Sequence, residues 1–334
     1  MKNGYPLTAE QYKLALQLEG VFMPQARRQR LKAGFGEEVQ VPIRFVHYTS
    51  AEAALSIIKN KRLWMRNAVC MSDYREVQHG LDILRAFFSD VGRRDRFLNA
   101  IEKCHAGIGQ EAIKMFDERL HDIQLEMYIS SISEHDDAED GHGRLSMWRA
   151  FGSSPARVAL AFRIPKMSGG SLALNLLFSP VTYLTEDEAR DVFDEVSASV
   201  EKSTDFLRSV NREIVLGTIF IMLMAATVCL KHEGFKEERE WRAIYFPTVR
   251  PSPLMESSTE VVGGVPQPIY KIPLDRTVDA VLGDLDFVGM FDRLIIGPSP
   301  YPWVMYKAFT AALSEAGCSN ASELVFASRI PIRS

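Results

Sequence analysis

The segment 214–230 constrains the fold more than any other feature, because it contains 17 consecutive residues without a charged side chain. A helix this apolar is either surrounded by protein on every side or crosses a bilayer, which takes about 20 residues. Charged residues flank the segment at both ends, and Gly217, Thr218 and Thr227 interrupt it. We therefore predict a fully buried core helix rather than a transmembrane helix.

The composition is that of an ordinary globular protein. A length of 334 residues corresponds to about two domains, or to one domain with insertions. With 46% hydrophobic and 25% charged residues, long disordered regions are not expected. The net charge of −4 gives no overall basic field of the kind that nucleic-acid backbone binders use. The basic residues at 27–32 are expected to form a solvated helix face.

The cysteines and the amino end bear on the compartment. Cys70, Cys104, Cys229 and Cys318 are scattered, without the spacing of a zinc site or of a disulfide framework. This pattern is typical of a reducing compartment. The first residues show no apolar signal-peptide core. We therefore expect a cytoplasmic protein that is not inserted in a membrane.

The hydrophobic patterns predict an α+β fold. Residues 1–40 are expected to form an N-terminal helical extension, and residues 41–334 a single α+β domain with helical insertions near 75–127 and 185–231. Because strands and helices do not alternate regularly, α+β is favoured over a doubly wound sheet. No GxGxxG or P-loop motif occurs. Strands are predicted at 41–47, 63–66, 127–133, 157–164, 181–184, 241–246, 269–272, 294–296 and 324–328, and helices at 145–150 and 301–316.

The first candidate site is His47-Tyr48-Thr49, at the end of a predicted strand. Such positions commonly line binding sites, and here an imidazole could bond a ligand hydroxyl while the tyrosine ring offers a stacking face. The alternative is that His47 bonds a backbone group and that Thr49 or Ser50 only caps the following helix.

Two further candidates lie in later strands. Ser131 and Ser133 alternate along a strand, where their hydroxyls could orient a ligand or a catalytic carboxylate; the alternative is a polar strand edge. Glu238 and Glu240 are expected to point to the same side of a strand and to raise each other's pKa unless an arginine intervenes. Paired carboxylates suit the stabilisation of positive charge on a sugar ring, although a salt-bridged strand start fits equally.

The remaining polar clusters have weaker patterns. Trp148 and Arg149 could present a guanidinium to a phosphate, or could be a core tryptophan beside a surface arginine. Asp73, Glu76 and His79 are spaced three apart, which does not place two metal ligands on one helix face as the His-x3-His spacing does. The acidic loop 134–144 lacks the pattern of a calcium-binding loop. We expect a solvated helix side and a flexible loop, without a bound metal.

Taken in order, these motifs resemble a mainly bacterial family, the domain of unknown function 2971. The resemblance covers about residues 41–334, and Ser72 departs from it where asparagine is expected. The family has no settled activity. The motifs are His47-Tyr48-Thr49, Ser131-Ile132-Ser133-Glu134, Leu145-Ser146-Met147-Trp148-Arg149, Lys231-His232 with Gly234-Phe235, and Glu238-Arg239-Glu240-Trp241-Arg242.

A weaker similarity of pattern is to ADP-ribosyltransferases of the DNA-modifying toxin type. A strand ending in His-x-Thr, a helix, a serine-bearing strand and a glutamate entering a strand follow one another in that order. The similarity implies a split β-sheet core with NAD as the substrate. His47 would bond the adenosine-side ribose or the nicotinamide amide, and Tyr48 or a nearby aromatic residue would stack on nicotinamide. Glu240 would bond the nicotinamide ribose and stabilise the oxocarbenium-like transition state, and Glu238 would orient the acceptor. Arg149 would hold the pyrophosphate, and the binding set is completed by Thr49, Ser131, Ser133 and Trp148.

Three functions are therefore open. The first is an NAD-using ADP-ribosyltransferase or NAD glycohydrolase, of the toxin or defence-effector type, acting on a small-molecule nucleotide and on a protein or nucleic-acid acceptor. The second is a non-enzymatic ligand-sensing or partner-binding module with a degenerate site. The third is a metal-dependent nuclease that uses Asp73, Glu76, His79 or the acidic loop.

Overall fold

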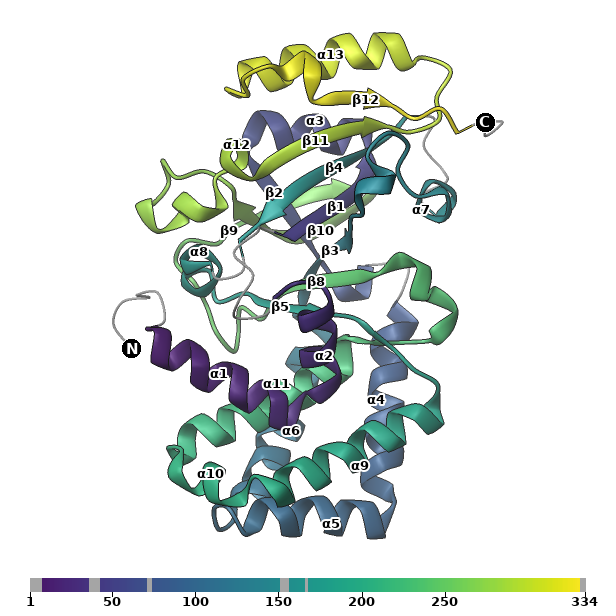
Figure 1. The fold of residues 1–334 in the computed structure, drawn as a ribbon. Helices are drawn as coiled ribbons and strands as arrows, with labels where there is room; N and C mark the ends of the chain where they lie inside the picture. The colour runs from purple at the N-terminus through teal and green to yellow at the C-terminus, as the bar shows by residue number, and fades with distance from the viewer. Residues whose placement is uncertain (1–7, 36–42, 71–73, 151–155, 166–167, 331–334) are drawn as a thin grey trace.

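A computed structural model describes residues 8–35, 43–70, 74–150, 156–165 and 168–330 (Figure 1). It confirms the α+β class: within these residues a mixed ten-stranded sheet lies above a body of helices. The predicted boundary at residue 40 falls outside the described residues. The sheet consists of β1 (Ile43–Ser50), β2 (Arg62–Asn67), β3 (Tyr128–Glu134), β4 (Arg157–Ile164), β5 (Leu177–Pro180), β8 (Glu240–Tyr245), β9 (Glu256–Val262), β10 (Val265–Pro273), β11 (Phe291–Ile296) and β12 (Val325–Ala327).

The helices divide between the two parts. The helical body contains α1 (Ala9–Phe22), α2 (Pro24–Lys32), α4 (Tyr74–Ser89), α5 (Val91–Glu102), α6 (Ile108–Leu125), α9 (Glu186–Lys202), α10 (Thr204–Ser209) and α11 (Arg212–Val228). Near the sheet lie α3 (Ala51–Asn60), α7 (Leu145–Ala150), α8 (Gly169–Ala173), α12 (Phe287–Met290) and α13 (Pro302–Glu315). Short 3-10 helices are η1 (Ala68–Cys70), η2 (Asp137–Glu139), η3 (Glu233–Glu238), η4 (Ala280–Leu285) and η5 (Ala321–Glu323), and β6 (Thr182–Tyr183) pairs with β7 (Leu230–Lys231).

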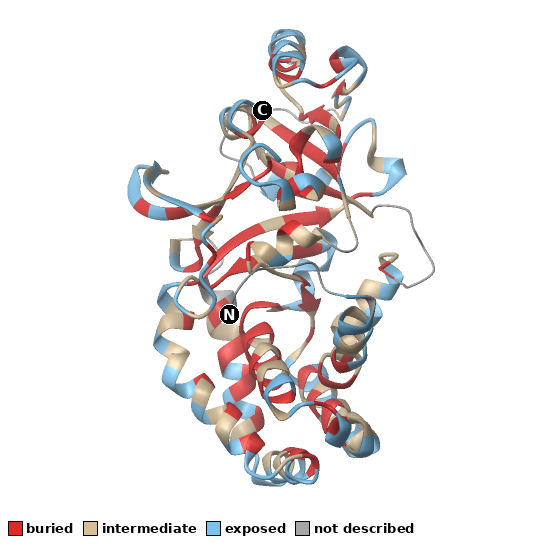
Figure 2. Ribbon diagram, turned by 90° about the vertical axis from the view of Figure 1, so that its left-hand side faces the viewer, coloured by how far each residue is buried: buried red, intermediate tan, exposed pale blue. Residues whose placement is uncertain are grey.

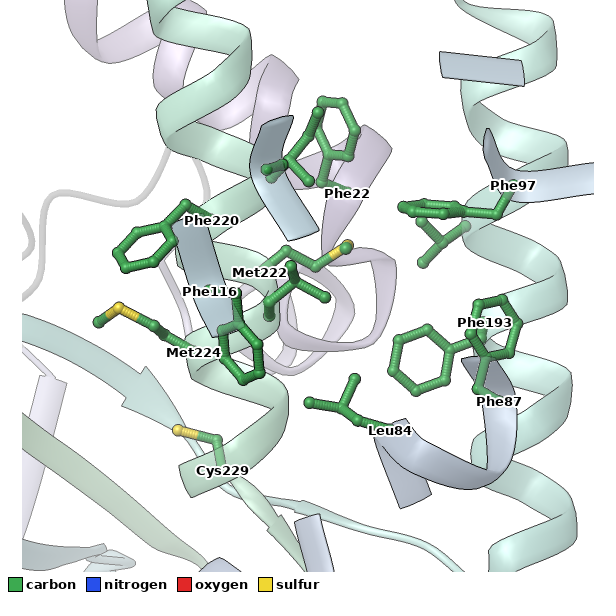
Figure 3. Close-up of a cluster of buried hydrophobic side chains, with 14 of the residues drawn as sticks. Phe22, Leu84, Phe87, Phe97, Phe116, Phe193, Phe220, Met222, Met224 and Cys229 are labelled. Carbon is green, nitrogen blue, oxygen red and sulfur yellow. The ribbon is translucent and has the colours of Figure 1, made fainter. Parts of the chain in front are cut away.

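The helix predicted from the uncharged segment is α11, and it lies in the core of the helical body. Side chains from α1, α4, α5, α6 and α9 surround it in one apolar cluster (Figure 3). Phe87 of α4 stacks on Phe193 of α9 with ring centroids 4.7 Å apart, so these two helices also pack against each other. Among the described residues, no helix has both the length and the apolarity that crossing a membrane requires.

The sheet forks at β3. One edge of β3 pairs with β8 along its whole length, from Tyr128 to Ser133. The opposite edge is shared: β2 pairs with it at Tyr128 and Ile129, and β1 pairs with it at Ser133 and Glu134. Beyond these contacts β1 continues with β4 and β2 continues with β10, so the two arms diverge. The residues of β3 at the base of the fork are 130–132.

The two faces of the forked sheet are buried against different partners (Figure 2). Ile129 of β3 and Ile244 of β8 belong to the apolar cluster of the helical body. On the other face, Ile132 and Trp241 form a separate cluster with Phe45. Because side chains alternate along a strand, neighbouring residues of β3 are in contact with different cores.

The structure corrects the end of the first predicted strand. β1 continues to Ser50, whose hydroxyl accepts from the Ala53 backbone N–H and caps α3. His47 therefore lies within a strand rather than at its end, since β1 pairs with β4 without interruption. The hairpin of β9 and β10 is also longer than the predicted strand at 269–272, and the strand predicted at 181–184 shortens to β6.

Close packing of α4 on α11 gives a direct test of the helical body. A Cβ added at Gly80 would lie 2.4 Å from the carbonyl oxygen of Thr227, whereas a Cβ at Gly217 would meet nothing within 4 Å. We expect Gly80→Ala to lower the free energy of unfolding by about 1–3 kcal/mol, because backbone cannot yield as a side chain does. Gly217→Ala, the control, should raise it by up to about 1 kcal/mol. Urea denaturation measures both, and equal effects would contradict this packing.

Candidate functional site

Ser131 connects two of the predicted site residues. Its backbone carbonyl accepts a hydrogen bond from Nδ1 of His47 at 3.0 Å, and its hydroxyl donates to Oε1 of Glu240 at 2.5 Å. The three residues come from β1, β3 and β8, and β1 and β8 pair with opposite edges of β3. Residues far apart in the chain therefore meet at the base of the fork.

Glu240 lies at the centre of a buried group of charges. Its Oε1 accepts from Nε of Arg242 at 2.8 Å, and its Oε2 accepts from Nη2 of Arg242 at 3.0 Å and from Nζ of Lys231 at 3.4 Å. These partners outweigh burial and lower the pKa of Glu240 to about 2, with the nearby Arg242 guanidinium the largest favourable cause. The carboxylate is therefore ionised at neutral pH, and each oxygen already accepts two hydrogen bonds.

Lys231 was not expected to be important, yet it is the most deeply buried of the charged residues at the site. Its side chain is 1% exposed, and its Nζ lies 2.7 Å from Oε2 of Glu238 and 4.6 Å from the ring centre of Phe235. Burying an ammonium is costly unless carboxylates compensate it. Lys231 is therefore held between Glu238 and Glu240, and it fixes their separation.

The expectation that strand alternation aligns the two glutamates is wrong. Glu238 ends η3, and Arg239 adopts a left-handed backbone with φ of 44° before β8 begins at Glu240. The two carboxylates nevertheless meet, because both bind Lys231. Glu238 is the more accessible of the two, with a side chain 25% exposed against 8% for Glu240.

Strand alternation separates His47 from Glu240. Phe45 and Trp241 pack edge to face on one side of the sheet, with ring centroids 5.2 Å apart. His47 is two residues beyond Phe45 and so lies on that side, together with Thr49, whereas Glu240 is adjacent to Trp241 and lies on the other. The expectation that His47 and Glu240 face one another across one cleft is therefore wrong, and the two residues are linked only through Ser131.

His47 itself is half-buried, and burial lowers the pKa of its imidazole below the ordinary value. Because the Ser131 carbonyl can only accept, the neutral ring carries its proton on Nδ1. Its Nε2 can then accept a hydrogen bond but cannot donate one.

Tyr48 is part of the core rather than a stacking platform. It is 4% exposed, packs edge to face on Trp148 at 4.9 Å, and accepts a hydrogen bond from the Arg144 backbone N–H. Burial raises the pKa of its phenol to about 12. The predicted stacking of Tyr48 on nicotinamide is therefore wrong for this conformation of the chain.

Trp148 and Arg149 differ in burial as the alternative interpretation predicts, with a core tryptophan beside a surface arginine. Trp148 is fully buried and donates its indole N–H to the His142 carbonyl, while Arg149 is exposed on α7. α7 packs against η3, so Arg149 belongs to an element that neighbours Glu238. Ser133 is 3% exposed and lies opposite Glu240 in the β3–β8 ladder.

The acidic loop is engaged by arginines. Arg44 reaches Asp137, Asp140 and Asp292, and His135 bonds Asp140 through Nε2 at 2.9 Å. Within the described ranges, no group of three His, Cys, Asp or Glu residues has the arrangement of a metal site. The predicted cluster at 73–79 cannot be assessed in the same way, since Asp73 and the Glu76 side chain lie outside the description.

Four residues complete the site without having been singled out as candidates. Arg144 donates to the backbone carbonyls of Glu237 and Glu238, and the Tyr183 hydroxyl accepts from the Glu240 backbone N–H at 2.8 Å. Phe235, 44% exposed, forms the rim of the site and covers the buried Lys231. Lys231 and Phe235 belong to the motif at 231–235, but only the tertiary structure shows that Lys231 contacts both glutamates and that Phe235 packs on Lys231.

Comparison with known proteins bears on this region. Residues 147–243 match the model of a family described as "Protein of unknown function (DUF2971)". The matched segment includes Trp148 and Arg149, Lys231, and Glu238 to Arg242, and it supports the family resemblance there. No curated protein and no solved structure matches the chain.

The buried carboxylate makes a prediction about stability. Glu240→Gln removes the carboxylate charge that compensates Arg242 and, together with Glu238, compensates Lys231. It should therefore lower the free energy of unfolding by about 3–5 kcal/mol at pH 7. The exposed neighbour provides the control: Glu237→Gln should change this free energy by less than about 0.5 kcal/mol.

The effect of Glu240→Gln should also depend on pH. The folded pKa of about 2 lies below the ordinary 4.5, so the stabilisation by Glu240 is complete above pH 4.5 and is lost as the pH falls towards and through 2. The stability gap between wild type and Glu240→Gln should therefore narrow progressively below pH 4.5. Denaturant titrations from pH 7 to pH 3 measure the gap, and a gap that is constant over this range would contradict an ionised Glu240.

Proposed function

We propose that the chain is an NAD-using enzyme of the ADP-ribosyltransferase or NAD glycohydrolase type, with its reacting site at the base of the forked sheet. The observation that carries the proposal is that Ser131 bonds His47 through its backbone carbonyl and Glu240 through its hydroxyl. It unites three motifs that the sequence order alone singles out. The acceptor would be a protein or nucleic-acid group.

The electrostatics of the site fit loss of nicotinamide. When the bond between nicotinamide and ribose breaks, positive charge develops on the ribose, and a fixed carboxylate nearby lowers the energy of that state. Glu240 is ionised at neutral pH, and Ser131 and Arg242 hold its orientation. Preorganisation of this kind avoids the cost of reorienting the carboxylate during the reaction.

The rim supplies groups that suit the rest of a dinucleotide. Phe235 presents an exposed aromatic ring beside Lys231, and Arg149 is an exposed guanidinium on the neighbouring α7. An aromatic face stacks on a base, and an arginine matches a pyrophosphate with paired hydrogen bonds. Phe235 takes the role that was predicted for Tyr48. Glu238, more exposed than Glu240, would orient the acceptor nucleophile.

One observation favours a second candidate, a ligand-sensing module that binds without turnover. Both oxygens of Glu240 are already saturated by Ser131, Arg242 and Lys231. A carboxylate so fully engaged suits a structural charge cluster at least as well as a catalytic one. Under this alternative the rim would hold a ligand and no bond would break.

Nicotinamide release from NAD by the purified full chain separates the two candidates. The enzyme proposal predicts release that is independent of divalent metal and that falls at least about 100-fold in Glu240→Gln, since one preorganised charge contributes on that scale. Ser131→Ala, which keeps the ion pairs, should lower the rate less. Glu237→Gln should match the wild type.

Binding is measured on the same samples by calorimetry, with folding checked by circular dichroism. NAD binding without release would support the ligand-sensing module and exclude the enzyme. Neither binding nor release by a folded wild-type chain would exclude NAD as the ligand in both cases. Release that persists in a folded Glu240→Gln variant would overturn the role of Glu240.

A further inference from the structure

A cavity of about 170 Å³ lies on the face of the sheet opposite Glu240, over the fork. Ser130 and Ile132 of β3 lie at its base, and Phe162 of β4 and Leu63 of β2 come from the two diverging arms. Residues of α8, η4 and α12 also line it. The cavity therefore fills the space that opens because β1 and β2 separate.

The walls of the cavity are almost entirely apolar. Three phenyl rings contribute to them, from Phe35, Phe162 and Phe178. Arg30 also lines the cavity, but its guanidinium is paired with Glu19 and lies over the rings of Phe35 and Trp241. Its charge is already compensated, so the cavity does not call for a charged ligand.

Three serines line this mostly apolar surface, Ser130, Ser168 and Ser171, and Ser130 is the buried one. It is 4% exposed, it lines the cavity, and its hydroxyl has no hydrogen-bond partner among the described residues. A buried hydroxyl without a partner is unfavourable, because it has lost water and gained nothing in return. A ligand that supplied the missing hydrogen bond would remove this cost.

We propose that this cavity is a binding site for a small aromatic molecule that carries a single hydroxyl group, bonded by Ser130. Size supports the assignment, since an apolar cavity of about 150 Å³ is enough to hold a benzene-sized ligand. The three phenyl rings offer edge and face contacts to an aromatic ring. The cavity lies on the other side of the sheet from Glu240, because Ser130 and Ser131 point to opposite faces of β3, and His47 does not line it. The proposal therefore does not depend on the function proposed above.

Phenol and toluene are matched probes, because they have similar size and differ in the hydroxyl group. An apolar cavity without a polar partner rejects phenol, whose hydroxyl would be desolvated without compensation. Titration calorimetry on the full chain should show that wild type binds both probes. In Ser130→Ala, the affinity for phenol relative to toluene should fall about tenfold or more. Ser209→Ala, an exposed serine on α10, is the control and should keep the wild-type ratio.

Filling the cavity provides the second test. Ala243 lines it from β8, so Ala243→Leu should abolish binding of both probes while the chain stays folded. Ser130→Ala should also raise the melting temperature of the chain without ligand, because it removes an unpaired buried hydroxyl. A folded wild type that binds neither probe would overturn the proposal. An unchanged phenol-to-toluene ratio in Ser130→Ala would overturn the role of Ser130.

Discussion

The carboxylate of Glu240 joins the two parts of the molecule. It binds Ser131 and Arg242 of the sheet and Lys231, which follows the core helix α11. Arg242 also donates from Nη1 to the carbonyl of Val228, the last residue of α11. A helix C-terminus carries partial negative charge and unsatisfied carbonyls, so a guanidinium is well suited to that position. The uncharged helix and the forked sheet therefore meet in one charge network.

This arrangement explains why so many charges are buried together. Each of Glu240, Arg242 and Lys231 would be costly to bury alone, but together they compensate one another with well-placed hydrogen bonds. The same network fixes the separation of Glu238 and Glu240 and keeps Glu240 ionised. A rigid, preorganised carboxylate is what electrostatic catalysis uses, and it is equally what a structural junction uses, so activity measurements must decide between the two roles.

The fold was predictable where the sequence pattern depends on neighbouring residues alone, as hydrophobic periodicity and strand propensity do. The uncharged segment identified α11 as a core helix, although its first turn is not fully buried, since Ile214 is 45% exposed. The β-branched and aromatic runs located most strands. Long-range partners were less accessible. A lysine is rarely buried, so nothing local indicated that Lys231 would be 1% exposed between two glutamates. The left-handed backbone at Arg239 keeps Glu238 out of the strand. It could not be foreseen, because such a conformation is usually indicated by a glycine and this position is an arginine.

The sequence predicted which residues belong to the candidate site better than it predicted how their side chains are arranged. Ser131 and Glu240 do meet, but His47 and Tyr48 were placed by the expectation that β1 ends at residue 47, and β1 continues to Ser50. Because side chains alternate along the longer β1, Tyr48 packs in the core beside Trp148, and His47 lies on the opposite side of the sheet from Glu240. A split sheet was expected, but the position of the fork could not be predicted, because it depends on which strands share the edge of β3.

The most direct test of the account is a crystal structure of the Glu240→Gln variant grown with NAD. The account predicts that the nicotinamide ribose lies at the base of the fork, within hydrogen-bonding distance of residue 240, with Phe235 against a base. A dinucleotide bound elsewhere on the molecule, or a folded variant whose crystals show this region unchanged at saturating NAD, would contradict it.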